Sequence, residues 1–436
     1  MKNFEKVIGY ENIKVELNHI LDIIHNKEKY SKLGVKLPRG VLLYGDVGLG
    51  KSLFANCFIE ASGWKSYICR KDEPNGDFVK HITKTFEEAR VNEPCIILLD
   101  DMDKFANEDE NHKNAEEFIA IQSGIDSVKN CEVLVFATAN ELRSLPESLL
   151  RIGRFDRKIR IENPTVKDSA NIIKYYLSQK KFVDEIDAKE IANITSNCSC
   201  AELETLINEA GIYAGYKNKE KIEMEDIIKA CLRQYFNAPI NKNEVGIDFN
   251  ENEANKNIEL ETAYHEAGHA VVAEVLEPKS VSLVSIEAHG GDIGGVTVYN
   301  QDENYFKIKR LMENRVLSLL SGKAATEIVF GEIDVGSQND MERAYRIINR
   351  FVCQYSSFGF DVFQYDSYEF KGNASNDCKA KKENIIYKEM ERYYQIAKKI
   401  LIENRIFLDK LAHKLVEKQT LLSKDIQQIK EECKSK

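Results

Sequence analysis

The stretch "VLLYGDVGLGKSLF" (residues 41–54) joins an apolar run, a glycine-rich turn and a helix-like segment. It fits the pattern G-x-x-x-x-G-K-[S/T], in which backbone N–H groups surround phosphate oxygens, the lysine reaches the β and γ phosphates and the hydroxyl binds Mg²⁺. This pattern predicts a site for ATP and Mg²⁺. Its residues are Gly45, Asp46, Val47, Gly48, Leu49, Gly50, Lys51, Ser52 and Leu53.

Four more short apolar runs alternate with helix-like segments around this stretch: "SYIC" from 66, "CIILL" from 95, "EVLVFAT" from 132 and "KIRI" from 158. Such alternation is typical of an α/β domain with a parallel sheet. We predict this domain over residues 1–164. A small helical domain should follow over 165–237, because "SCAELETLINEAGIYAGY" (199–216) repeats apolar residues at spacings of three and four.

Polar residues at the predicted strand ends complete the nucleotide site. Asp100 follows "CIILL" and is the expected Mg²⁺ partner, while Asp101 would polarise the attacking water. Asn140 follows "VFATA" and could orient water or the γ phosphate. Arg151 and Arg154 in "LLRIGRFDRKI" fit either arginine fingers that act on a neighbouring subunit or a surface cluster of salt bridges.

A second chemical motif lies in "TAYHEAGHAVVAEVL" (262–276). His265 and His269 are four residues apart, so on a helix both imidazoles leave the same face and can share one Zn²⁺. Glu266 is placed to take a proton from the attacking water and pass it to a leaving amine. A catalytic zinc needs a third protein ligand. No local pattern supports His289 or His413, and two carboxylates, Glu327 and Asp340, are better placed.

Composition narrows the possible partners. The 436-residue chain has a formal net charge of −10, which argues against a nucleic-acid or anionic-membrane surface. It shows neither a signal peptide nor an apolar window of roughly 18 residues, so we expect no integral membrane segment and a cytoplasmic protein. The ten cysteines lack paired spacings and read as ordinary core residues.

The second half of the chain is mostly helical in pattern. A polar linker is expected at 238–257 and a zinc peptidase domain at 258–436. Two β-rich stretches, "SVSLVSI" (280–286) and "GGVTVY" (294–299), interrupt the helical pattern. The polar stretch "KGNASNDCKAKKEN" (371–384) is expected to be an exposed loop.

Together the two halves resemble the FtsH-type AAA proteases, from about Phe4 to about Phe360. The resemblance is carried by "KLGVKLPRGVLLYGDVGLGKS", "EEARVNEPCIILLDD", "LLRIGRFDRKI", "TAYHEAGHA", "LLSGKAATEIVFG" and "GSQNDMERA". It implies an ATPase with a helical lid, then a mostly helical zinc peptidase. The modules would form a homo-hexameric ring that pulls polypeptide substrates into a chamber for cutting.

The resemblance also implies roles for single residues. The third zinc ligand of the family falls on Asp340, and Glu327 falls on an acidic position beside the site. Ile8 and Gly9, in "NFEKVIGYENIK", belong to the nucleotide site. The stretch "GGDIGGVTVYN" resembles the edge strand on which a substrate pairs.

Departures from the family pattern concentrate in the first half. Asp101 stands where a Glu is usual, Cys200 replaces a lid glycine and Ile152 replaces a proline. Phe78 is the only aromatic near the expected pore loop. Membrane-spanning segments usually precede the ATPase domain in the family, whereas here the match begins at the ATPase domain. We expect a form without them, either a soluble relative or a trimmed piece of a longer protein.

These observations predict an ATP-dependent zinc metalloendopeptidase that unfolds and degrades proteins. Two alternatives remain. The first is a zinc peptidase with a weakened or regulatory ATPase, which would cut unfolded polypeptides without ATP-driven threading. The second is a remodelling or scaffold ATPase with a vestigial zinc site.

Overall fold

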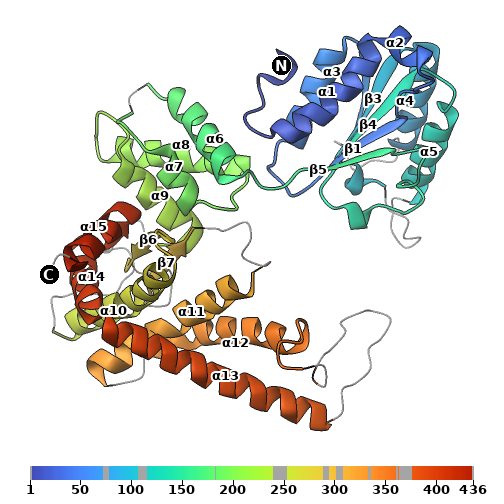
Figure 1. Ribbon diagram of the computed structural model, residues 1–436. Coiled ribbons are helices and arrows are strands. Elements are labelled where there is room, and N and C mark those ends of the chain that lie inside the picture. The colour runs from blue at the N-terminus through green and yellow to red at the C-terminus, as the bar shows by residue number, and fades with distance from the viewer. Residues whose placement is uncertain are drawn as a thin grey trace. The chain divides into compact units, whose positions relative to one another are not determined.

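The computed structural model describes residues 2–71, 78–106, 115–181, 183–238, 253–287, 294–300, 308–331, 335–359, 362 and 376–434. The chain forms two compact units, Met1–Ile222 and Glu223–Lys436 (Figure 1). Within the described residues, no helix has both the length and the apolar character required to cross a bilayer.

A five-stranded parallel sheet organises the first unit, and its strand order is β2-β3-β4-β1-β5. The five apolar runs of the sequence form these strands, so the predicted α/β fold is confirmed. Their bounds are β1 Gly40–Tyr44, β2 Lys65–Arg70, β3 Cys95–Asp100, β4 Val133–Ala139 and β5 Arg157–Arg160.

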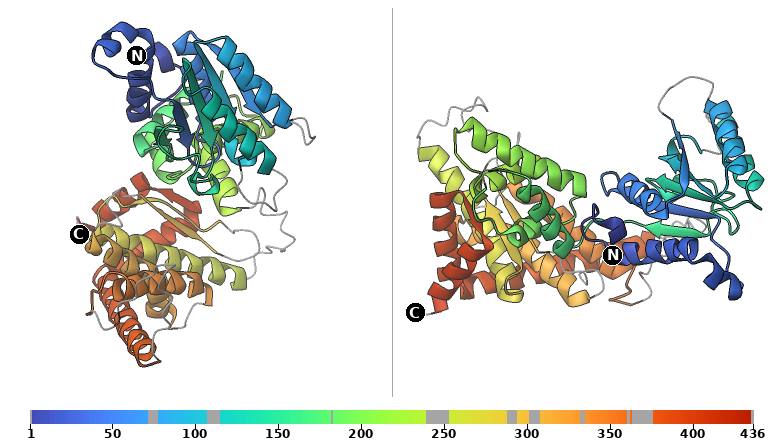
Figure 2. Two further views of the ribbon diagram at one scale, coloured as in Figure 1. Left: turned by 90° about the vertical axis from the view of Figure 1, so that its right-hand side faces the viewer. Right: turned by 90° about the horizontal axis from the view of Figure 1, so that it is seen from above.

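Helices cover both faces of this sheet (Figures 1 and 2). Successive strand residues point to opposite faces, so Val41 and Leu43 join one buried cluster while Leu42 joins another. The first face carries α1 (Glu11–His25) and α3 (Lys51–Ser62), and the second carries α4 (Phe78–Val91) and α5 (Ala115–Ser127). A short α2 (Lys27–Lys32) follows α1.

The lid helices of the first unit are α6 (Val166–Ser178), α7 (Ala188–Ile194) and α8 (Cys200–Tyr216). Ser199 and Glu202 form a capping box that fixes the start of α8. That start lies against the phosphate loop, because the Ala201 N–H donates to the Gly48 carbonyl at 3.1 Å. The second unit begins with α9 (Met224–Phe236).

Long helices and a small antiparallel sheet build the rest of the second unit (Figures 1 and 2). The helices are α10 Glu253–Leu276, α11 Lys309–Phe330, α12 Gln338–Cys353, α13 Asn376–Glu403, α14 Arg405–Lys418 and α15 Ser423–Lys434. The strands β6 Val281–Ser285, β7 Val296–Tyr299 and β8 Thr420–Leu422 pair in the order β7-β6-β8.

A glycine brings α10 and α11 close together. A Cβ atom on Gly268 would lie 2.6 Å from the Ser321 carbonyl oxygen, so no larger residue fits there. The Ser321 hydroxyl donates to the Gly268 carbonyl at 3.0 Å across the same crossing. This close approach sets α11 beside the HExxH segment of α10.

Two predicted segments differ in part from the structure. The prediction of an exposed loop at 371–384 is wrong for residues 376–384, because these residues belong to α13, which begins at Asn376. Its Lys, Ala and Glu residues are good helix formers, and high polarity also suits a solvated helix. Most of the expected linker, residues 239–252, lies outside the described residues, and α10 begins at Glu253.

Candidate functional site

The phosphate loop holds the Lys51 amine at the end of β1. Its Nζ donates to the carbonyls of Gly45 and Asp46, both at 2.7 Å, and to Asn140 Oδ1 at 2.9 Å. Gly48 and Gly50 adopt φ values of 83°, which favour glycine. Burial lowers the pKa of Lys51, although nearby aspartates act in the opposite direction.

Asp100 lies where a magnesium ligand is expected, at the carboxyl end of β3. Its Oδ1 accepts hydrogen bonds from Ser52 Oγ at 3.0 Å and from Thr138 Oγ1 at 2.7 Å. Its Oδ2 forms an ion pair with Arg70. Ser52 and Asp100 therefore offer adjacent oxygen atoms of the kind that Mg²⁺ prefers.

The next carboxylate, Asp101, has a left-handed backbone with φ 54°. Its Oδ2 pairs with Lys104 Nζ at 2.6 Å. The neighbouring strand end is also anchored, because Asn140 Nδ2 donates to Asp103 Oδ2 at 2.9 Å. The structure thus brings Asp101 and Asn140 to the same sheet edge as Lys51.

The two arginines after β4 differ in their surroundings. Arg154 forms an ion pair with Asp126 at 2.7 Å and donates to the Ser148 carbonyl at 2.7 Å. Arg151 is exposed, and the adjacent Ile152 is 97% exposed. Within this unit, Arg154 therefore holds the loop in place while Arg151 and Ile152 face outward.

The N-terminal segment meets the lid beside the phosphate loop. Gly9, next to Ile8, has φ 74°, and a Cβ on it would lie 2.5 Å from Asp168 Oδ1. Tyr10 Oη lies 3.4 Å from Cys200 Sγ at the start of α8. The predicted residues Ile8 and Gly9 thus belong to a segment packed on the lid.

In the second unit, three predicted metal ligands converge. His265 Nε2 and His269 Nε2 are 3.0 Å apart, and Asp340 Oδ2 lies 3.3 Å and 3.0 Å from them respectively. Both histidines are buried on α10, and Asp340 reaches them from α12. Within the described residues, this is the group whose geometry could hold a metal ion.

The donor set and its surroundings fit zinc. Ligand atoms about 2.1 Å from a tetrahedral zinc are about 3.4 Å apart, close to the 3.0–3.3 Å found here. His269 Nδ1 donates to the Ser318 carbonyl at 2.6 Å, which leaves its Nε2 lone pair for a metal. Burial alone would raise the pKa of Asp340, but His269 and His265 hold it well below its usual value.

Glu266 lies beside these ligands and is also buried. Its Oε2 accepts a hydrogen bond from Thr297 Oγ1 of β7 at 2.6 Å. A Cβ on Gly295, the residue before β7, would lie 2.3 Å from Glu266 Cγ, so no larger residue fits at this position. The strand therefore fixes the carboxylate next to the metal ligands.

These groups open into a cavity of about 780 Å³ in the second unit. Its wall includes both histidines, Glu266 and Asp340, together with Thr297, Tyr299, Arg315 and Arg343. A cavity of this size can admit several residues of an extended polypeptide.

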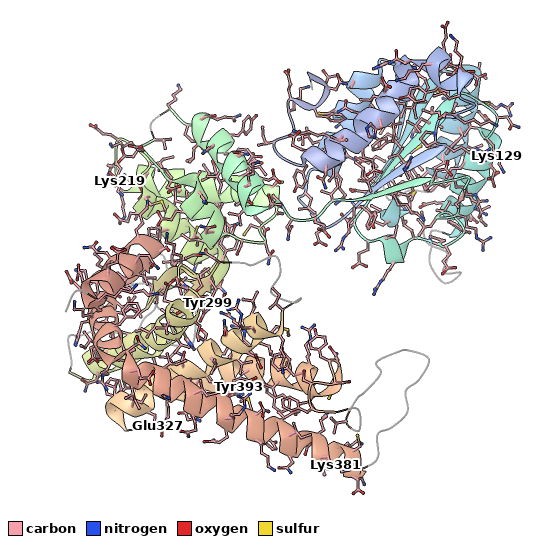
Figure 3. All side chains as sticks on the ribbon, viewed as in Figure 1. Lys129, Lys219, Tyr299, Glu327, Lys381 and Tyr393 are labelled. Carbon is pink, nitrogen blue, oxygen red and sulfur yellow. The ribbon has the colours of Figure 1, made fainter. Side chains whose placement is uncertain are left out.

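Two of the other candidates for the third ligand, Glu327 and His413, do not join the histidines. Glu327 lies near the end of α11, apart from Tyr299 (Figure 3), and pairs with Lys398 at 2.7 Å rather than with the histidines. His413 contacts Tyr264 through its ring. Phe78, the aromatic residue nearest the expected pore loop, is buried against Phe105. His289 lies outside the described residues.

Sequence reasoning missed two supports of the metal group. Ser318 acts through its backbone carbonyl, which carries no sequence signal. A Cβ on Gly322 would lie 2.6 Å from His269 Nε2 and 2.7 Å from His265 Nε2. That glycine could have been noticed, because it stands in "LLSGKAATE" one α11 turn after Ser318.

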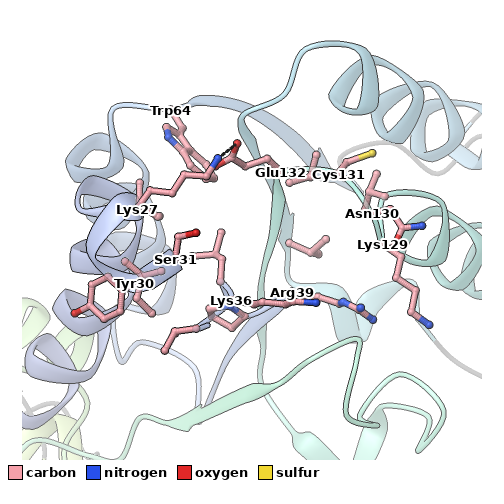
Figure 4. A pocket seen from close by; sticks show the side chains of 18 of the residues that line it. Lys27, Tyr30, Ser31, Lys36, Arg39, Trp64, Lys129, Asn130, Cys131 and Glu132 are labelled. Carbon is pink, nitrogen blue, oxygen red and sulfur yellow. Dashed lines mark hydrogen bonds and ion pairs between the residues drawn. The ribbon is translucent and has the colours of Figure 1, made fainter. Parts of the chain in front are cut away.

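A second cavity, of about 480 Å³, lies in the first unit (Figure 4). It is lined by the segment before β1 and by the start of β4, so it lies at the opposite sheet edge from the phosphate loop. Lys27 pairs with Glu132 across it at 2.7 Å. Arg39 links this cavity to the loop that carries Arg151 and Arg154 (residues 151–156, the arginine loop), since its Nη1 donates to the Gly153 carbonyl at 3.3 Å.

Comparison with known families agrees with this division of sites. Residues 41–163 match the ATPase family associated with various cellular activities (AAA), and residues 185–229 match the AAA+ lid domain. Residues 252–429 match peptidase family M41.

Similar proteins align along nearly the whole chain. The ATP-dependent zinc metalloprotease FtsH 2 of Thermoanaerobacter sp. (strain X514) is 32% identical, over 98% of this chain and 83% of its own length. FtsH of Bacillus subtilis (strain 168) is 30% identical, over 98% of this chain and 69% of its own. FtsH 2 of Phytoplasma mali (strain AT) is 32% identical, over 98% of this chain and 62% of its own.

Proposed function

Because the chain belongs to the FtsH-type family of ATP-dependent zinc metalloproteases, we propose that its AAA unit delivers polypeptides and its M41 unit cuts them. The protein is an ATP-dependent zinc metalloprotease, and its cofactors are zinc, ATP and Mg²⁺. The observation that carries the proposal is the convergence of His265, His269 and Asp340 beside Glu266 in one cavity.

In the peptidase unit, His265, His269 and Asp340 are the proposed zinc ligands. A bound zinc ion supplies Lewis-acid polarisation of the peptide carbonyl and of water. Glu266 then takes a proton from the attacking water and delivers it to the leaving nitrogen. The hydrogen bond from Thr297 Oγ1 keeps the Glu266 carboxylate aimed at the cavity.

In the AAA unit, the loop from Gly45 to Leu53 is the proposed phosphate cradle. Lys51 would neutralise the phosphates, and Ser52 with Asp100 would hold Mg²⁺. Asp101 and Asn140 would orient the attacking water. The support for these roles is that Lys51, Asn140 and Asp100 meet at the carboxyl edge of the sheet.

We propose that copies of the chain form a homo-hexameric ring in the cytoplasm. In that ring Arg151 would reach a neighbour's nucleotide as an arginine finger, with Arg154 as a second contact. The exposure of Arg151 and Ile152 supports this role, since both are available to another subunit. Light scattering with ATP should give the mass of six chains, and Arg151→Ala should lower the ATPase rate of that assembly.

The experiment for the main function is degradation of casein by zinc-loaded protein with ATP, with a non-hydrolysable analogue, or without nucleotide. Cleavage that needs hydrolysable ATP supports delivery by the AAA unit. Cleavage that ignores nucleotide would favour a peptidase that acts without threading.

A matched pair of variants assigns the cleavage to the proposed site. Glu266→Gln should abolish degradation while zinc stays bound. Glu261→Gln changes an exposed carboxylate in the wall of the same cavity and should keep the activity. Equal degradation by the wild type and Glu266→Gln would rule out the proposed chemistry.

A further inference from the structure

A cationic side chain in the peptidase cavity is left unused by the proposed chemistry. Arg315 of α11 lines the cavity that also contains the metal ligands. Its guanidinium stacks on the Tyr299 ring, with Cζ 3.6 Å from the ring centroid. Its Nη1 atom is buried and has no hydrogen-bond partner among the described residues. A buried guanidinium donor without a partner is costly, so a ligand that accepts from it would be favoured.

The neighbours of Arg315 hold it in a fixed position. Tyr299 Oη lies 2.7 Å from Ser318 Oγ, and the Ser318 carbonyl accepts the hydrogen bond of His269. Stacking occupies a face of the guanidinium and restricts its plane, so hydrogen bonds to a planar acceptor can form only along its N–H edge. The site is thus already oriented for a carboxylate, which accepts two parallel N–H bonds from arginine.

The position of Arg315 along α11 sets its distance from the reaction. Gly322 touches the zinc-ligand atoms of both histidines, and Arg315 precedes it by seven residues. Seven residues of α-helix span about 10 Å. The Arg315 backbone is therefore displaced along α11 from the metal ligands, and its side chain reaches the Tyr299 ring.

The edge strand β7 shows how many substrate residues separate Arg315 from the scissile bond. In the sheet that the structure describes, β7 pairs only with β6, so its other edge is open to an added strand. Thr297 contacts Glu266, and Tyr299, two residues further, contacts Arg315. A polypeptide paired on β7 advances about 3.3 Å per residue. Arg315 then faces a residue about two to four positions from the cut.

We propose that Arg315 forms a carboxylate-binding subsite of the peptidase cavity. Its guanidinium binds a carboxylate of the bound polypeptide about two to four residues from the scissile bond. This carboxylate belongs to an acidic side chain or to the chain end. The inference rests on the proposed peptidase function of this cavity. It makes the enzyme favour acidic residues at one defined position of an otherwise weakly specified substrate.

The test uses internally quenched peptides and the full-length, zinc-loaded protein with ATP. One series carries Glu, its neutral isostere Gln, or Lys at successive positions, and mass spectrometry locates each cut. At one position about two to four residues from the cut, Glu should lower KM about tenfold relative to Gln with little change in kcat. A second series compares a free C-terminal carboxylate with an amide at the same distance, which separates the two sources of the charge.

Three variants connect the preference to this side chain. Arg315→Gln should remove the difference between Glu and Gln peptides, and Arg315→Glu should reverse the preference in favour of Lys. Arg310→Gln removes an exposed charge from the same helix and should retain the wild-type preference. Zinc content should stay unchanged in all three.

The outcomes distinguish the subsite from the general function. Equal KM values for Glu and Gln at every position and for acid and amide ends, or a preference that survives in Arg315→Gln, overturn the subsite while peptide cleavage stands. No cleavage of any peptide by zinc-loaded wild type overturns both the peptidase function and the subsite.

Discussion

At the scale of single residues, the geometry of the metal ligands depends on Gly322, which is not itself a ligand. Gly322 packs its bare Cα against both zinc-ligand nitrogens, so the ligands are positioned by the lack of a side chain on α11. His269 is then oriented by a backbone carbonyl from the same helix. The HExxH pattern supplies the ligand atoms, but α11 determines where they point.

Gly322→Ala should therefore bind zinc more weakly. Its methyl group would lie 2.6 Å from His269 Nε2, and displaced or misoriented ligands typically weaken metal binding about tenfold or more. Competition with a chromogenic chelator measures the affinity. Gly215→Ala in α8 is the control, because a Cβ there meets nothing within 4 Å. An unchanged zinc affinity in Gly322→Ala would contradict this prediction, because it would show that α11 shifts enough to admit the methyl group without displacing the ligands.

Asp101 offers a second prediction at this scale. Removing its charge with Asp101→Asn should slow ATP hydrolysis about a hundredfold or more, as loss of a general base usually does. Asp101→Glu should hydrolyse ATP faster than wild type, because the extra methylene extends the carboxylate by about 1.5 Å. A steady-state ATPase assay measures both.

The control for this pair is Glu141→Gln, an exposed carboxylate at the neighbouring strand end. It should leave the ATPase rate unchanged. A full ATPase rate in Asp101→Asn would mean that another group activates the water.

At the scale of elements, the arginine loop (residues 151–156) is held by Asp156 as well as by the ion pair of Arg154 with Asp126. Asp156 accepts the backbone N–H of Gly153 at 2.7 Å and that of Arg39 at 2.8 Å. Asp156→Ala frees both bonds, so the loop with Arg151 should lose its fixed position. The ATPase rate of the assembly should then fall about tenfold while nucleotide affinity is kept.

Nucleotide affinity is measured with a fluorescent ATP analogue, and the rate with a coupled assay. Glu147→Ala changes an exposed side chain nearby and serves as the control. If Asp156→Ala loses nucleotide binding together with the rate, the loop supports the fold of the site rather than catalysis across subunits.

The helices and strands also show which parts of the fold could be predicted from the sequence. All five parallel strands were predicted from the sequence. The three inner strands β1, β3 and β4 are buried along their length and form continuous apolar runs, whereas the edge strands β2 and β5 are largely exposed and have shorter apolar runs. β8 was missed, because the three residues Thr420–Leu422 are too few to show an alternating pattern. This strand forms only because it pairs with β6, which is distant in the sequence. The grouping of Asp340 with the histidines came from the family resemblance, because no spacing rule connects residues 71 apart.

At the scale of the whole molecule, each unit has hydrophobic cores of its own. The described core residues from Ala263 to Ile429 form one cluster, while those from Phe4 to Ile161 form two around the parallel sheet. The two chemical sites therefore rest on separate cores. Each site should be removable without unfolding the other.

This separation gives the last prediction. Lys51→Ala should abolish ATP hydrolysis, since the amine that meets the phosphates is lost, but it should keep zinc and the cleavage of short unstructured peptides. Degradation of a folded reporter should disappear. Removal of zinc by a chelator should do the reverse, stopping all cleavage while the ATPase rate changes less than about twofold. If zinc-loaded Lys51→Ala fails on short peptides too, nucleotide controls the cutting step itself as well as the delivery of substrate.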